Sequence, residues 1–296
     1  MLSILIPTYN YNVFPLASQL EKQALASDIL FEIICFDDGS KSSINSKNEK
    51  INSLTYSKFL AQQHNVGLSN NRNALAEASK YQFLLFIDGD SLLPDETFIF
   101  RYIEAIKKNT DVVYGGRIHP KTVDSSRKLR WKYGIYKEDS TSIKRNKNIY
   151  KSVLFNNTLI KKNVFNTIGF EKSITEYGHE DTVFAYNLSK IKASIFHIDN
   201  PVLHGDVDLN EDYYKKTHKS LENLDSIYKT KMIEPEFTTF LKVFIKLEKF
   251  KLNYFFAFVY KILSPFFTYN LISKHPSLNV FELFRLSYFC HINLKK

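Results

Sequence analysis

The stretch FLLFIDGD, residues 83–90, joins five apolar residues to two aspartates that flank one glycine. An apolar run of this length that ends in Asp and Gly is typical of a buried β-strand followed by a tight turn. Because Gly89 lets the backbone approach closely, the turn would present Asp88 and Asp90 to one cation, and hard oxygen ligands suit Mg²⁺ or Mn²⁺. The alternative is a solvated turn, where acidic residues and glycine are common.

Three further apolar runs, at residues 3–6, 31–36 and 112–114, alternate with amphipathic segments around this stretch. Such alternation predicts a doubly wound α/β sheet whose strands run parallel. The carboxyl ends of parallel strands lie at one edge of the sheet, and ligands bind there. The motifs PTYN at 7–10 and DDGS at 37–40 follow the first two runs, so we expect their polar side chains to converge with the two aspartates.

The chain has 296 residues, of which 44% are apolar, enough for one core with an appendage or for two small domains. Its formal charge of +9 suits anionic partners such as nucleotide phosphates, lipid headgroups or nucleic acid. The two cysteines, Cys35 and Cys290, indicate neither a disulfide framework nor a metal site. No run reaches the roughly 20 apolar residues of a spanning helix, because Lys261 and Pro265 interrupt the best candidate at 254–269. A cytoplasmic protein is therefore expected.

Two further motifs complete the pattern. NVGLSNNRNALAEAS, residues 65–79, leads into a helix ahead of the D-G-D strand, and YGHED, residues 177–181, precedes another helical segment. Negative charge is favoured near a helix N-terminus in any protein, so Glu180 and Asp181 taken alone indicate no function.

In their order and spacing, these five elements resemble the family 2 glycosyltransferases of the GT-A fold. The resemblance covers about residues 1–210 and implies a Rossmann-like, mostly parallel sheet in a catalytic domain over residues 1–234. It implies an inverting enzyme that moves a sugar from a nucleotide-diphosphate donor to a hydroxyl acceptor. UDP is the expected nucleotide, because an aspartate paired to the base suits the N3–H donor of uracil, and GDP and dTDP stay open.

The resemblance also implies a donor site. Tyr9 would stack on the base while Asp38 accepts a hydrogen bond from it, and Arg72 would brace this pocket or reach a phosphate. The family often has alanine before this arginine, where Asn71 stands here. One carboxylate of the D-x-D would reach the ribose, and the other would hold Mn²⁺ or Mg²⁺ on the diphosphate, which assists the leaving group. The expected nucleotide-sugar site comprises Pro7, Tyr9, Asn10, Asp38, Arg72, Asp88, Gly89 and Asp90.

The E-D motif implies the catalytic base. Asp181 is expected to take the proton from the acceptor hydroxyl, with Glu180 as the alternative base or as an acceptor binder. His204 would complete the metal site with Asp90, because imidazole is a ligand for Mn²⁺, or it is a hydrogen-bonded surface residue. His179 would contact phosphate or acceptor, or be a plain loop residue.

Residues 117–150 are basic and polar, and we expect a long loop over the site. Trp131, the only tryptophan, would be a platform for an acceptor sugar or would pack into the core. The surrounding RKLRW is similar to the Q-x-x-R-W of processive synthases, but it lacks the glutamine and precedes the E-D motif. We therefore expect an enzyme that adds a single sugar.

The tail, residues 235–296, is predicted to be a separate basic and aromatic helical region. Its apolar residues at helical spacing and its lysines fall on different faces: Phe237, Phe240, Leu241, Phe244 and Leu247 against Lys242, Lys246 and Lys249. This amphipathic pattern predicts docking on an anionic membrane surface, near a lipid-linked acceptor. The alternative is a helical subdomain that packs on the catalytic domain or forms an oligomer interface.

Two other functions fit part of the pattern. A sugar nucleotidyltransferase would carry G-x-G-T-R after the first strand, where PTYN stands. A non-catalytic nucleotide-sugar binding protein has no need of both a D-G-D and a separate E-D. The basic stretch 127–147 is interpreted as an acceptor loop rather than a nucleic-acid site. We therefore expect a glycan or lipid-linked acceptor, used in surface polysaccharide or glycolipid synthesis on the cytoplasmic face of the membrane.

Overall fold

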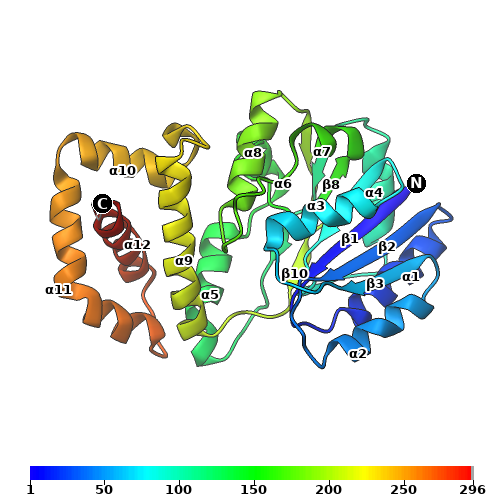
Figure 1. Cartoon of the computed structure of the whole chain (residues 1–296), viewed down its shortest axis with the longest axis horizontal. Helices are drawn as coiled ribbons and strands as arrows, with labels where there is room; N and C mark the ends of the chain where they lie inside the picture. The colour runs from blue at the N-terminus through cyan, green and yellow to red at the C-terminus, as the bar shows by residue number, and fades with distance from the viewer. Residues whose placement is uncertain (295–296) are drawn as a thin grey trace. The chain divides into compact units, whose positions relative to one another are not determined.

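The computed structural model describes residues 1–294, and Figure 1 shows the arrangement of their helices and strands. The strands are β1 (Leu2–Thr8), β2 (Phe31–Asp37), β3 (Ser57–Ala61), β4 (Phe83–Ile87), β5 (Ser91–Leu92), β6 (Val112–Tyr114), β7 (Arg117–Ile118), β8 (Asn157–Lys161), β9 (Ile195–His197) and β10 (Val202–His204). The α-helices are α1 (Phe14–Ala26), α2 (Asn45–Asn48), α3 (Leu68–Ala78), α4 (Phe98–Ile106), α5 (Lys128–Tyr133), α6 (Ser142–Arg145), α7 (Lys162–Ile168), α8 (Glu180–Lys190), α9 (Asn210–Lys229), α10 (Thr239–Lys249), α11 (Leu252–Ile272) and α12 (Leu278–Asn293).

The chain divides into two compact units. The first comprises Met1–His119, Asp139–Thr175 and Glu180–Asp206, and the second comprises Pro120–Glu138, Glu176–His179 and the chain from Val207 onward. The second unit therefore contains α9 and two short earlier segments in addition to the basic tail. The division into a catalytic domain over residues 1–234 and a separate helical region over 235–296 stays a prediction.

The first unit is built on a seven-stranded sheet with the order β3-β2-β1-β4-β8-β6-β9. β1 pairs in parallel with both β2 and β4, as the alternation of strands and helices predicted. The expected mostly parallel α/β sheet is thus confirmed, with one correction: β8 runs antiparallel to its neighbours β4 and β6. An apolar run carries no signal of its direction, because side chains alternate across a strand in the same way in both orientations.

Alternate residues of the central strands pack against different helices. Ile4 and Ile6 of β1 and Leu85 of β4 belong to the cluster that includes α1 and α4. Phe86 points to the other face, where its ring meets Phe155 and Phe165 at centroid distances of 5.5 and 5.3 Å. The sheet is therefore buried on both faces, and the strand ends are left as the place where polar side chains can gather.

A smaller sheet with the order β5-β10-β7 lies beyond the ends of the main strands. β10 pairs antiparallel with β5, so that His204 lies opposite Ser91, and parallel with β7. The expectation of one long loop over residues 117–150 is wrong, because β7, α5 and α6 all form within it. These segments are too short to show a periodicity, and tertiary contacts stabilise them: the Arg145 guanidinium, for example, donates to the carbonyls of Gly115 and Ile198.

In the second unit, α9 to α12 pack together. Tyr260 and Phe267 of α11 contact Tyr288 and Phe284 of α12 at ring-centroid distances of 5.0 and 6.0 Å. Lys261 and Pro265 interrupt the apolar run but not the helix, since α11 is one helix of 21 residues with the proline inside it. Among the described residues it is the one helix long and apolar enough to cross a membrane. Phe267 and Leu271, which follow the proline, are buried.

Candidate functional site

The D-G-D turn lies at the carboxyl end of β4, directly beside the end of β1. A Cβ atom on Gly89 would lie 2.8 Å from the Val13 side chain and 3.2 Å from the carbonyl oxygen of Pro7. Any larger residue would have to displace the Val13 side chain and would press on the Pro7 carbonyl. Glycine is required here because the turn packs under the end of β1, which brings Asp88 and Asp90 to that edge of the sheet.

Arg72 of α3 is the centre of a buried charge group in the first unit. Its side chain is 1% exposed. One guanidinium nitrogen lies 2.9 Å from Asp88 Oδ1, and the other lies 2.8 Å from Asp181 Oδ1 and 3.3 Å from Glu180 Oε1. Arg72 thus joins carboxylates of the D-G-D and E-D motifs, and both sequence-based roles for it, bracing the base pocket and reaching a phosphate, stay predictions.

The protonation of this group follows from its burial. Burial opposes the charged form of Arg72, but Asp181, Asp88 and Glu180 together hold its pKa above the ordinary value. Burial also raises the pKa of Asp88, against the lowering effect of Arg72. The pKa of Glu180 rises from 4.5 to about 7, first because the carboxyl is buried and then because Asp181 is close. Arg72 thus holds three carboxylates together, and burial raises the pKa of two of them, Asp88 and Glu180.

Asp181 is the most firmly oriented of the three carboxylates. Its Oδ1 accepts from Arg72, and its Oδ2 accepts from the backbone N–H of Phe155 at 3.1 Å. Each oxygen of a carboxylate has two lone pairs, so both can still accept a proton or another hydrogen bond. Glu180 and Asp181 begin α8. The predicted general base is therefore held in one orientation by a guanidinium and a backbone amide.

Asp90 and His204 meet on the other side of the D-G-D turn. His204 Nε2 lies 3.0 Å from Asp90 Oδ2, and the backbone N–H of Gly205 donates to the Asp90 carbonyl at 2.9 Å. The β5–β10 pairing creates this contact between residues 114 positions apart. One carboxylate and one imidazole are a donor set that fits Mn²⁺, whereas Mg²⁺ prefers oxygen ligands and would use the carboxylate. Within residues 1–294 no group of three or more His, Cys, Asp or Glu side chains could hold a metal, so further ligands would have to come from substrate or water.

Three polar residues near the turn escaped sequence reasoning. Arg117 of β7 lies 3.7 Å from Asp88 Oδ2. His119 pairs with Asp139 at 2.7 Å, and its ring meets that of His204 at a centroid distance of 5.1 Å. The segment 117–150 gave no signal for them, because their placement depends on the pairing of β7 with β10.

The predicted base pocket lies at the ends of β1 and β2. Tyr9 is exposed, and Asn10 adopts a left-handed φ of 52° while its N–H donates to Asp37 Oδ1 at 3.3 Å. Asp38 is buried, and its two oxygens accept from the N–H groups of Val66 and Gly67 at 2.8 and 3.0 Å. Burial raises the pKa of Asp38 despite these hydrogen bonds. The DDGS turn is thus tied to the segment that leads into α3.

The two residues expected to contact the acceptor belong to the second unit. The indole N–H of Trp131 donates to the Pro120 carbonyl at 2.7 Å, and Lys128 Nζ lies 4.4 Å from the ring centroid. His179 has a left-handed φ of 69°, and burial together with Arg285 lowers its pKa to about 4. His179 is therefore neutral at physiological pH.

Glu180→Gln is expected to raise Tm relative to wild type by more at pH 8 than at pH 5. A carboxyl whose pKa is raised in the folded state contributes stability below its unfolded pKa, near 4.5, and this contribution disappears as the pH rises through about 7. Glutamine keeps the shape of the protonated form at every pH. Thermal unfolding of both proteins from pH 5 to 8 measures the difference, and a gap in Tm that stays constant or shrinks with pH would contradict it.

Solved structures share this fold at low sequence identity. S. aureus TarS 1–349 matches with a TM-score of 0.51 and 20% identity over 75% of this chain and 65% of its own. Its complex with UDP-GlcNAc matches with a TM-score of 0.52, 20% identity and coverage of 75% and 66%. The mannosyltransferase PcManGT from Pyrobaculum calidifontis, in complex with GDP-Man and Mn²⁺, matches with a TM-score of 0.50 and 13% identity over 77% of this chain and 64% of its own. The chain thus spans slightly less than two thirds of each of these chains.

No curated protein matches the sequence. The profile of the family described as Glycosyl transferase family 2 matches residues 3–169, which is more than half of the chain. That range contains four of the five motifs on which the resemblance was based: the PTYN and DDGS turns, the segment with Arg72, and the D-G-D turn. The fifth, YGHED at 177–181, lies beyond it. From its fold and this match, the chain belongs to glycosyl transferase family 2 and has the GT-A fold.

Proposed function

We propose that this glycosyltransferase inverts the anomeric configuration and uses Mn²⁺ or Mg²⁺ to bind a UDP-sugar. The observation that carries the proposal is the contact of 3.0 Å between Asp90 Oδ2 and His204 Nε2, beside Asp88 at the carboxyl edge of the sheet. A hard cation held by few protein ligands keeps room for the oxygens of a diphosphate. Such an ion would supply Lewis-acid stabilisation of the leaving diphosphate.

The chain's own residues supply positioning and proton transfer. Asp181 takes the proton from the acceptor hydroxyl, while Arg72 and the Phe155 amide fix the orientation of its carboxylate. Glu180, with its raised pKa of about 7, is placed to bind an acceptor hydroxyl next to that base. Attack from the face opposite the diphosphate with a single base inverts the sugar, and no enzyme nucleophile takes part.

The nucleotide proposal combines Tyr9 and Asp38. An exposed ring at the end of β1 supports stacking on a base, and the second lone pairs of the Asp38 oxygens can accept from uracil N3–H. Among proteins of the same fold, TarS has been solved with UDP-GlcNAc and PcManGT with GDP-Man. UDP is therefore the first nucleotide to test and GDP the second.

The acceptor is proposed to be a glycan or lipid-linked hydroxyl, used in surface polysaccharide or glycolipid synthesis. Two observations support this proposal. The net charge of +9 favours anionic or phosphorylated acceptors, and the second unit carries an exposed apolar helix. Such an acceptor would lie at the cytoplasmic face of a membrane, where the enzyme would add one sugar at a time.

Calorimetric titration of UDP with and without Mn²⁺ tests the donor site. We expect Mn²⁺ to tighten UDP binding in the wild-type protein, and we expect Asp90→Asn and His204→Ala each to weaken the metal-dependent binding by at least tenfold, because each removes one metal ligand. Asp28→Asn, an exposed residue with a left-handed φ of 49°, is the matched control and should bind as wild type does.

Each result of this titration separates one part of the proposal from the rest. GDP binding without UDP binding would overturn the choice of nucleotide and keep the metal site. UDP binding that ignores Mn²⁺ and survives both substitutions would overturn the metal site. If no nucleoside diphosphate binds under any condition, the donor site itself is wrong.

A further inference from the structure

α11 has one face that packs and one that does not. Ala257, Phe267 and Leu271 are buried, and Thr268 Oγ1 lies 3.1 Å from the hydroxyl of Tyr214 in α9. Figure 1 shows α11 with α12 and α9 on one side of it within the second unit. The packed face accounts for only part of the helix, since only 17% of its most apolar stretch is buried.

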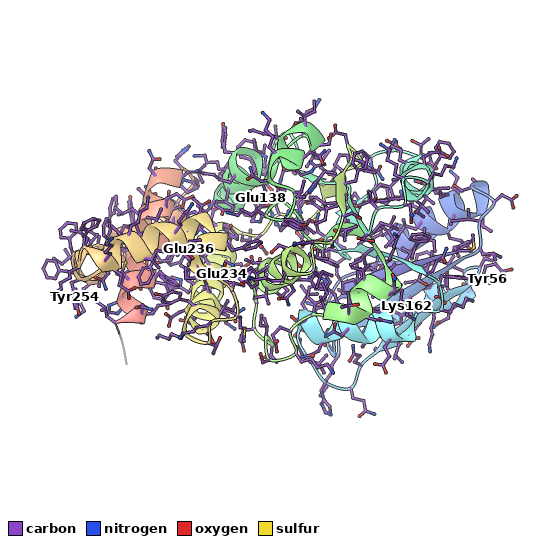
Figure 2. The ribbon with its side chains drawn as sticks, turned by 90° about the horizontal axis from the view of Figure 1, so that it is seen from above. Tyr56, Glu138, Lys162, Glu234, Glu236 and Tyr254 are labelled. Carbon is purple, nitrogen blue, oxygen red and sulfur yellow. The ribbon has the colours of Figure 1, made fainter. Side chains whose placement is uncertain are left out.

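The other face of α11 is apolar and exposed along the whole helix. Its side chains recur every three or four residues and are between 49% and 78% exposed: Tyr254, Phe258, Ile262, Phe266 and Tyr269. Figure 2 shows Tyr254 projecting away from the ribbon at the edge of the second unit. Single exposed apolar residues are ordinary on protein surfaces, but a continuous row of aromatic rings marks an interaction surface.

Exposed lysines lie on α10 and along α11. α10 places Lys242, Lys246 and Lys249 at helical spacing on its exposed side, while its Leu241 and Phe244 are buried. Further exposed lysines follow at both ends and in the middle of α11, at Lys251, Lys261 and Lys274. Against these six cations, Glu248 is the one acidic residue between 239 and 274. Exposed apolar side chains together with exposed cations on consecutive helices match a surface with an apolar interior and anionic headgroups.

α11 has the length to span a bilayer, but two observations favour an orientation in the plane of the membrane. Lys261 is the tenth of its 21 residues, so spanning would place an ammonium group at the centre of the bilayer. A spanning helix would also have to leave α12 and α9, whose side chains contact its buried face. Lying flat, the helix buries its aromatic rings while Lys261 reaches the headgroups.

We propose that α11 is an in-plane membrane-binding helix, which inserts the row from Tyr254 to Tyr269 into the headgroup region of an anionic bilayer while the α10 lysines bind the headgroups. This proposal extends the proposed function, since docking would bring the enzyme to a membrane-bound acceptor. It rests on that function only for the purpose of docking. Docking itself is measured without donor or acceptor.

Flotation of the full-length protein with vesicles tests the proposal. We expect binding to vesicles that contain 30% phosphatidylglycerol and much weaker binding to phosphatidylcholine alone. Phe258→Asp combined with Phe266→Asp should lower partitioning at least tenfold. Replacing Lys242, Lys246 and Lys249 by Gln should lower it about a hundredfold, since each near-surface cation contributes roughly fivefold. Phe100→Asp, which changes an equally exposed phenylalanine in the first unit, should change nothing.

The remaining outcomes overturn the proposal. Equal loss in Phe100→Asp, or no binding to anionic vesicles, rules out docking through α11. Vesicle-bound protein that resists extraction at pH 11 would show a spanning helix instead. If the wild type is a dimer without lipid and Phe258→Asp makes it a monomer, the row binds a second copy. UDP titration of the same variants keeps this test separate from the proposed function, because normal UDP binding should persist in each.

Discussion

Asp181→Asn is expected to slow sugar transfer by about 10²–10⁴-fold, the usual contribution of a general base. Asparagine keeps the size of the side chain and its contact with the Phe155 amide, but it cannot take a proton from the acceptor. Release of UDP from a UDP-sugar, by transfer or by hydrolysis, measures the loss. UDP binding should change by less than about threefold, because the hydrogen-bond contacts of Asp181 are with Arg72 and Phe155 and not with the residues proposed to bind the base or the metal.

Glu180→Gln is the matched comparison, because it removes the neighbouring carboxylate from the same helix turn. With Asp181 as base, this variant should lose roughly tenfold or less and show mainly a raised KM for the acceptor, the sign of lost binding rather than lost chemistry. A rate that falls as the pH drops through about 7 and nearly vanishes in Glu180→Gln would instead make Glu180 the base, given its raised pKa of about 7.

Arg72→Met is expected to destabilise the first unit by about 3–5 kcal/mol, the cost of removing one partner from a buried ion pair. Methionine approximates the length of the arginine stem but leaves Asp88, Glu180 and Asp181 without the cation they share. The shift in the urea midpoint at pH 7.5 measures the loss. It should shrink at pH 5.5, because the raised pKa of Glu180, about 7, allows this carboxyl to take up a proton.

Two further variants identify the cause of that loss. Lys22→Met breaks an exposed pair with Glu96 in the same unit and should cost less than about 1 kcal/mol. Arg72→Met combined with Asp181→Asn should be less destabilised than the sum of the two single changes, because the second change removes part of the uncompensated charge. Strict additivity would show that Arg72 stabilises through packing on Phe155 and Phe170 and not through its carboxylates.

Short-range sequence patterns were enough to predict the strands, the mostly parallel sheet and the family. FLLFI followed by D-G-D indicated a buried strand with a turn, and the structure places Ile87 in the core and Asp88 just beyond the strand. The alternation of such runs with amphipathic segments was enough for a mostly parallel sheet, and five motifs in order were enough for the family. These features depend on neighbours within a few residues, and a linear pattern records them.

Tertiary structure decided strand direction and the contacts that no motif indicated. Nothing local marks β8 as antiparallel, and nothing in the segment 117–150 marks β7, Arg117 or His119. The contact of His204 with Asp90 depends on the register of β10 against β5. The role of Arg72 as the shared partner of three carboxylates depends on how closely α3, α8 and the end of β4 pack. Charge pairing and strand register join residues about a hundred positions apart in the chain. A local sequence pattern does not predict which of these residues come into contact.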